Sequence, residues 1–253
     1  MLMRNVPQSR TGMRVGDLWY CSVDCFAEAA FVEFSAIQKR RVIEMPHNPR
    51  LSIGLVLLSK GHLANDQLRL AFDESQQHGE ELEFTLLRLG LTNERQLATA
   101  RAAQWGCPVL GQEFAAEPME ANIPVPLLRT CWAVPLRYSQ TGKRLLIGFV
   151  FRVEHRLLLA LEQVTGRKTE PCFITQTEFE EQMARLTVVP ECKAVFHEGI
   201  QTPRQMANAV AAQAIEAGAR KAIFAECRDY LWTRLIGGGQ TVDVLFQTQN
   251  RFN

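Results

Sequence analysis

The sequence predicts an α+β protein: an N-terminal helical repeat bundle, then a small α/β layer, then a C-terminal β-α-β-β-β module. Three observations predict it. A unit of helix, glycine, polar cap and second helix occurs twice between residues 52 and 105. Residues 108–188 combine apolar, branched runs with helical spacing, which indicates helices packed on a sheet. Residues 189–253 contain one capped helix among four runs of strand character.

The composition is that of an ordinary globular protein, with 47% hydrophobic and 22% charged residues. The net charge of +1 gives no bulk electrostatic case for a nucleic acid polymer or an anionic membrane as partner. No run of about 18 apolar residues occurs, so no transmembrane segment is predicted. Seven cysteines, an odd number, do not form a disulfide framework, which favours the reducing cytoplasm.

The first segment, residues 1–48, is predicted to hold a flexible lead-in over 1–18 and one helix. Ser22 is a plausible N-cap for that helix, since its hydroxyl can accept from the amides of the first turn. Pro46 and Pro49 end it, because prolines so close together exclude a continuing helix. We therefore place a domain boundary near residue 48.

Cys21 and Cys25, at the start of this helix, could form half of a zinc site. Zinc takes about four thiolate or imidazole ligands in a tetrahedron. The arrangement resembles the second half of small bacterial zinc knuckles, but residues 1–46 contain no other cysteine and no histidine. Two cysteines without a metal are the simpler interpretation, and zinc is not expected.

The second segment, residues 49–107, carries the duplication. Residues 54–76 and 83–105, offset by 29 positions, share the identical pairs Leu57/Leu86, Leu58/Leu87, Gly61/Gly90, Gln67/Gln96, Leu68/Leu97 and Ala71/Ala100. Gly61 and Gly90 can close the first helix of each copy in a left-handed conformation. Asn65 is predicted to cap the second helix of the first copy, and Thr92 or Asn93 that of the second. Two such hairpins can pack as a small bundle suited to binding.

Residues 108–188 are predicted to form strands over 131–138, 144–151 and 170–175, with helices over 153–164 and 178–186, the last capped by Thr177. Residues 189–253 are predicted to form a strand over 193–197, a helix capped by Thr202, and strands over 221–227, 230–236 and 240–247. A module of some sixty residues is marginal alone, so we expect it to pack on the α/β layer.

The pattern IGxxLxxxGHLxxxQLxxAxxxSQ, followed by LExxLLxLGLxxxxQLxxAxxxQWGCPVL, resembles the N-terminal domain of type II secretion and type IV pilus assembly ATPases, called the GspE N-terminal or MshEN domain. The resemblance continues through 123–128, 132–137, 144–148, 157–166 and 170–174, and so covers about residues 50–187. It does not extend to the C-terminal module.

This resemblance implies two alternative roles: binding of cyclic di-GMP, or docking on a protein of the secretion machine. In nucleotide-binding members each copy begins Arg-Leu-Gly, where glycine admits the ligand, leucines cover the bases and arginine contacts phosphate. By resemblance, the ligand-binding positions of this chain are Ile53, Gly54, Leu58, Gly61, Leu68, Gln76, Leu82, Gly90, Leu97 and Gln104.

The chain departs from this pattern at both Arg-Leu-Gly positions. The first copy has Ser52-Ile53-Gly54 and the second has Glu81-Leu82-Glu83, so both arginines are replaced and two carboxylates are added. Each lost charge-assisted contact is worth about 1.5–3 kcal/mol. An anionic dinucleotide would thus lose its strongest contacts and gain repulsion.

The phosphate-binding motif G-x-x-x-x-G-K-[ST] is absent from the sequence, so ATP hydrolysis is not expected. We therefore expect a non-catalytic, cytoplasmic regulatory or protein-interaction protein without a cofactor. Its partner would be a component of a secretion or pilus machine. The alternative is a cyclic di-GMP sensor with a degenerate motif.

Overall fold

The computed structural model describes residues 12–41, 51–111, 123–138, 144–186, 193–200 and 202–248. Its helices are α1 (Val23–Arg41), α2 (Ile53–Ser59), α3 (Asn65–His78), α4 (Leu82–Arg88), α5 (Glu94–Trp105), α6 (Val125–Thr130), α7 (His155–Thr165), α8 (Gln176–Leu186) and α9 (Pro203–Glu216). Its strands are β1 (Met13–Val15), β2 (Leu18–Tyr20), β3 (Ala133–Tyr138), β4 (Arg144–Phe149), β5 (Lys168–Phe173), β6 (Lys193–His197), β7 (Lys221–Cys227), β8 (Tyr230–Gly237) and β9 (Gln240–Gln247).

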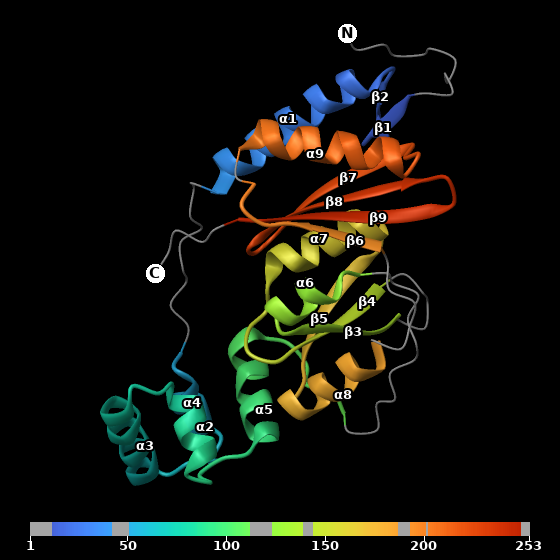
Figure 1. Ribbon diagram of the computed structural model, residues 1–253. Helices are drawn as coiled ribbons and strands as arrows, with labels where there is room; N and C mark the ends of the chain where they lie inside the picture. The colour runs from blue at the N-terminus through green and yellow to red at the C-terminus, as the bar shows by residue number, and fades with distance from the viewer. Residues whose placement is uncertain are drawn as a thin grey trace.

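The duplicated segment forms two helical hairpins, α2–α3 and α4–α5, at one end of the molecule (Figure 1). Their first helices end at Gly61 and Gly90, with φ of 70° and 66°, as predicted. Asn93 caps α5 by accepting from the Gln96 amide at 2.9 Å. The prediction for the first copy was one residue off: Ala64, not Asn65, is the N-cap of α3, so this helix has no side-chain cap.

The α/β layer is a three-stranded sheet in the order β3-β4-β5. β3 and β4 are antiparallel, β4 and β5 are parallel, and α7 makes the crossover between the parallel strands. The α8 cap differs from the prediction. Thr175, not Thr177, accepts from the Glu178 amide at 3.1 Å, and the Glu178 carboxylate accepts from the Thr175 amide at 2.7 Å.

A six-stranded sheet in the order β2-β1-β7-β8-β9-β6 joins the two ends of the chain. β1 and β2 lie in or beside the stretch predicted to be a flexible lead-in, and β1 pairs in parallel with β7 some 200 residues later. The first and last segments, which the sequence predicts as separate units, share one sheet. The apolar face of α1 explains this: Phe34 packs edge-on against Phe224 of β7 and Phe246 of β9.

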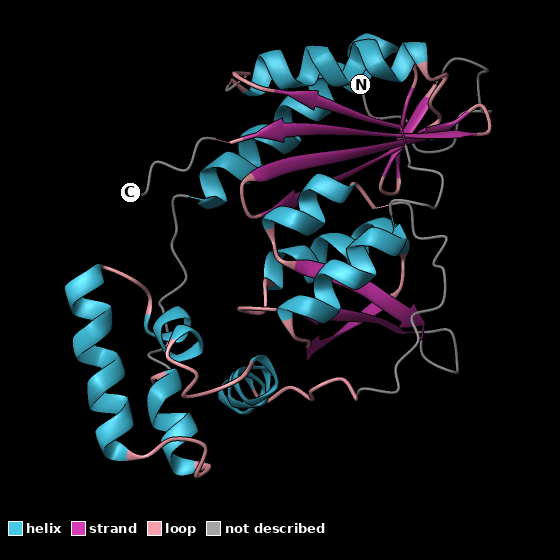
Figure 2. Ribbon diagram, turned by 60° about the horizontal axis from the view of Figure 1, so that its bottom comes forward, coloured by secondary structure: helices cyan, strands magenta, loops and turns pink. Residues whose placement is uncertain are grey.

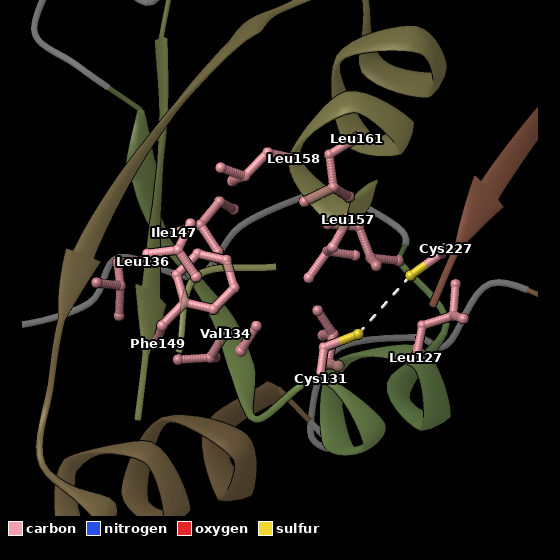
Figure 3. Packing of buried hydrophobic residues seen from close by; sticks show 14 of the residues in the cluster. Leu127, Cys131, Val134, Leu136, Ile147, Phe149, Leu157, Leu158, Leu161 and Cys227 are labelled. Carbon is pink, nitrogen blue, oxygen red and sulfur yellow. Dashed lines mark hydrogen bonds between the residues drawn. The ribbon is translucent and has the colours of Figure 1, made fainter. Parts of the chain in front are cut away.

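The layers alternate through the molecule. α1 and α9 cover one face of the six-stranded sheet, and α7 lies between its other face and the three-stranded sheet (Figure 2). Figure 3 shows the resulting core, where Leu157 and Leu161 of α7 lie near Cys227 of β7. The Cys131 and Cys227 sulfurs are 3.7 Å apart in this core. The C-terminal module thus packs on the α/β layer, as expected.

A buried ion pair fixes the register of β8 and β9. Arg234 donates two hydrogen bonds of 2.8 Å to the two carboxylate oxygens of Asp243, its cross-strand partner. Trp232 Nε1 donates to the same carboxylate at 2.7 Å. Asp243 is fully buried, so these donors provide the compensation that a buried charge requires. Within the described chain, no helix combines the length and apolar character needed to cross a membrane.

Candidate functional site

The hairpin pair brings three of the predicted ligand-binding residues into contact. Gly54, near the start of α2, faces Leu68 of α3 and Leu82 of α4. A Cβ atom added at Gly54 would lie 2.6 Å from Leu68 Cδ1 and 3.3 Å from Leu82 Cδ2. We call Gly54, Leu68 and Leu82 the repeat seam. The glycine therefore does admit a close approach, but the groups that approach are the chain's own leucines.

The second copy carries a partly buried ion pair where the first copy has the uncharged Gly54 and Phe72. Glu83 occupies the position equivalent to Gly54 and is paired with Arg101 of α5. Arg101 is only 5% exposed, and its Nη1 donates to the Val150 carbonyl oxygen at 2.9 Å. Its guanidinium also lies 5.0 Å from the centre of the Phe151 ring. A carboxylate expected to repel an anionic ligand is thus paired with a cation of the same chain.

Arg101 is a residue that the sequence reasoning missed. Its equivalent in the first copy is Phe72, 29 positions earlier, which is exposed. The signal was present: the copy that gained a carboxylate at Glu83 also gained a cation. Because 18 positions separate the two, only the folded hairpin shows that they meet.

Gln104 also contacts protein. Its side-chain amide donates to the Leu51 carbonyl oxygen, just before α2, and so ties the end of the second copy to the start of the first. The equivalent residue in the first copy, Ser75, is buried and donates to the Phe72 carbonyl oxygen of its own helix at 2.9 Å. Gln76, predicted to contact ligand, is exposed on α3.

The remaining predicted residues have scaffold positions. Gly61 and Gly90 hold positive φ at helix ends, and no atom would lie within 4 Å of a Cβ added to either. They serve the turns and do not admit a close neighbour. Ile53 and Leu97 are buried in the bundle core, and Leu58 is half-buried. The structure therefore brings together Gly54, Leu68 and Leu82, and it bonds Gln104 to Leu51, but it does not gather all ten predicted residues at one site.

Arg88, a cation on α4, is also engaged within the fold. Its Nε donates to Glu80 at 3.1 Å, and its Nη2 lies 3.5 Å from Glu74. The hydrogen bond to Glu80 raises the pKa of Arg88, with a smaller contribution from Glu74. The two arginines Arg88 and Arg101 therefore already have carboxylate partners, which leaves less positive charge for an anionic ligand.

The hairpin pair exposes apolar side chains. Ten large apolar residues of the described chain are exposed, and five lie on or immediately before α2–α4: Leu51, Leu55, Leu70, Phe72 and Phe84. Leu55 and Phe84 are equivalent in the two copies and are 50% and 47% exposed. The hairpin pair, with half of the exposed large apolar residues of the described chain, is therefore a candidate contact surface.

The predicted half zinc site has its two sulfurs 3.8 Å apart at the start of α1. Ser22 Oγ accepts from the Cys25 amide at 3.2 Å, as predicted for an N-cap. Hydrogen bonding to Ser22, and then to Cys21, lowers the pKa of Cys25. Among the described residues, no three His, Cys, Asp or Glu side chains gather in a metal-binding group.

Comparison with known proteins found no matching protein-family profile. The type IV pilus assembly ATPase PilB of Thermus thermophilus is 24% identical over 135 residues, which are 53% of this chain and 15% of PilB. The chain thus spans about 15% of the length of that curated relative. Among solved structures, MshE with cdg is 22% identical, with a TM-score of 0.41 over 54% of this chain and 99% of that one.

The N-terminal domain of XpsE is 23% identical, with a TM-score of 0.40 over 53% of this chain and 92% of that one. The matched proteins correspond to N-terminal domains of ATPases, not to a catalytic domain. About half of this chain is similar to the N-terminal domains of type II secretion and type IV pilus ATPases.

Proposed function

We propose that this chain is a non-catalytic interaction protein whose helical hairpin pair docks on a protein of a secretion or pilus machine. The observation that carries this proposal is the repeat seam. Leu68 and Leu82 fill the space beside Gly54, and Glu83 is paired with Arg101. The positions that would receive a small ligand are occupied from within the chain, while Leu55 and Phe84 remain exposed beside them.

A protein partner suits this surface better than an anionic ligand does. An anionic dinucleotide needs cations, and Arg88 and Arg101 are already paired with carboxylates. Glu81, at the N-cap of α4, adds an exposed negative charge. A protein surface needs apolar contacts with a polar rim, which Leu51, Leu55 and Phe84 can supply. The proposed setting of this interaction is the cytoplasm.

Site-specific photo-crosslinking in cells that make the protein tests the proposal. A photoreactive phenylalanine replaces Leu55 or Phe84, and the matched control replaces Ile215, which is 63% exposed on α9. We expect one crosslinked product from the first two positions, identified by mass spectrometry as a secretion or pilus component, and none from the control. The absence of a product, or the same product from all three, would overturn the proposal.

Cyclic di-GMP binding is the second candidate, favoured by one observation. The first copy retains Gly54, the glycine that in the nucleotide-binding pattern admits the ligand. Equilibrium dialysis with labelled cyclic di-GMP at micromolar protein tests it. A higher concentration of labelled cyclic di-GMP on the protein side of the membrane would support this candidate, provided that a folded Gly54→Glu variant shows no such excess. Equal concentrations across the membrane would exclude it.

A further inference from the structure

β7 is paired along its whole length on one side only. On that side every residue from Lys221 to Cys227 has a partner in β8. On the other side β1 pairs only with Lys221 and Ala222, because the chain turns away at Gly16 into β2. Within the described residues, no strand pairs with positions 223–225 on this second side. We call this side of residues 223–225 the β7 edge.

The backbone of Phe224 points toward the β7 edge. The Arg14 amide donates at 2.7 Å to the carbonyl oxygen of Arg220, the residue just before β7, so the even-numbered residues within β7 direct their backbone groups toward β1. Residues two apart in a strand point the same way. The N–H and C=O of Phe224 therefore extend the same row beyond the end of β1. Such an open row is a template for an added strand.

A hollow of about 660 Å³ lies beside this edge. Ile223 and Phe224 line it together with the β1–β2 turn, and a helix borders it on either side. α1 contributes Glu33 and α7 contributes Gln163. The edge is therefore recessed between two helices. The two β7 edges of a pair of chains would be held apart by these helices, whereas a single extended segment can enter.

The two sides of the recess differ in chemistry. On the α7 side, Leu159 is 61% exposed and lies on the same helical face as Arg156 and Gln163. Arg156 pairs with Glu226 of β7 at 2.5 Å. On the α1 side, the half-buried Glu33 lines the hollow and has no ion-pair partner among the described residues. Side chains of a strand alternate between two faces. A fitting strand would direct apolar side chains toward Leu159 and a basic side chain toward Glu33.

We propose that the β7 edge binds an extended segment of a partner protein as an added strand, with basic and apolar side chains in alternation. Phe224 supplies the backbone hydrogen bonds, Leu159 the apolar contact and Glu33 the charge. This surface lies on the six-stranded sheet, away from the helical hairpins. The inference therefore stands apart from the function proposed for the hairpins.

Selection from a random linear peptide library, displayed on phage, tests this proposal. The chain is the target, and a Leu159→Lys variant removes peptides that bind elsewhere. We expect enriched peptides with alternating basic and apolar residues, and synthetic copies should slow hydrogen exchange of the Phe224 amide at least tenfold. Methylating every second peptide amide should weaken binding at least tenfold. So should Glu33→Lys, whereas Val32→Lys, a neighbouring exposed position on α1, should leave binding unchanged.

Four results would overturn the proposal. The first is a selection that enriches no peptide, and the second is enriched peptides that leave the hydrogen exchange of the Phe224 amide unchanged. The third is a Phe224 amide that is already protected from exchange in the free chain, which would show that the edge is occupied. The fourth is a concentration-dependent dimer in sedimentation that Glu33→Lys abolishes, which would make a second copy of the chain the occupant.

Discussion

The two copies of the helical repeat share their turns and differ in their contacts. In each copy the residue after the turn glycine closes the first helix. The His62 amide donates to the Leu57 carbonyl oxygen at 2.9 Å, and the Leu91 amide donates to the Leu86 carbonyl oxygen at 3.0 Å. Two equivalent positions differ in chemistry, because the first copy has Gly54 and Phe72 where the second has Glu83 and Arg101. The turn geometry is thus kept while the chemistry of these two positions differs between the copies.

The difference follows from what surrounds each copy. α5 of the second copy packs both on the other hairpin helices and on the α/β layer. Leu97 lies in the core of the hairpin pair, and Ala98 and Ala102 lie in the core of the α/β layer. Arg101 extends this attachment through Val150. The first copy lies farther from the layer and exposes Leu55 and Phe72 (Figure 1). The second copy therefore serves attachment, and the first offers more surface to a partner.

Giving the first copy the carboxylate of the second should have the largest effect. Gly54→Glu places a carboxylate against Leu68 and Leu82 without a cation, and we expect a loss of about 3 kcal/mol in the free energy of unfolding. Gly54→Ala should change stability by less than about 1 kcal/mol, because only flexible leucine ends must move. Urea denaturation measures both. Adding Phe72→Arg to Gly54→Glu should recover part of the loss; no recovery would show that the copies are not interchangeable.

The turn glycines test whether the two scaffolds are equivalent. Gly61→Ala and Gly90→Ala each force a Cβ into a left-handed conformation, and each should cost about 1–2 kcal/mol. Because no atom crowds either position, the two losses should agree within about 0.5 kcal/mol when the variants are compared by denaturation. A much larger loss at one glycine would show that it has a role beyond its turn.

The helix caps should respond in opposite directions. Asn93→Ala removes the side-chain cap of α5 and should cost about 1 kcal/mol. Ala64→Asn, the matching change in the first copy, introduces a cap that α3 lacks and should raise stability by about 0.5–1 kcal/mol. The melting temperatures of the two variants check the signs. A destabilising Ala64→Asn would contradict the similarity of the two N-termini.

The smallest effect is expected at the ends of the copies. Gln104→Ala loses the hydrogen bond to the Leu51 carbonyl oxygen and should cost about 0.5–1.5 kcal/mol. It should also speed hydrogen exchange at the start of α2, which that bond holds to α5. Ser75→Ala, at the equivalent position, removes a bond within α3 and should leave exchange in α2 unchanged. Equal exchange in both variants would exclude Gln104 as a link between the copies.

Local patterns predicted most of the helices and strands, though not α6, β1 or β2, because glycines, caps and apolar spacing act over a few residues. Gly61, Gly90 and Asn93 are examples. The pairing of β1 with β7 could not be predicted, since a three-residue strand carries little signal and its partner lies 200 residues away. The seam residues followed from the resemblance, but Arg101 did not, because its role depends on a contact with another helix.

The Glu83–Arg101 pair of the second copy stands where the first copy has Gly54 and Phe72, and we expect the interaction of its two side chains to stabilise the fold. A double-mutant cycle with Glu83→Gln, Arg101→Met and their combination measures it directly. Glu83→Gln alone should cost about 2–3 kcal/mol, less than a fully buried pair because Glu83 is partly exposed. The account predicts a coupling of at least about 1.5 kcal/mol between the two side chains. Additive losses, with coupling below about 0.5 kcal/mol, would contradict it.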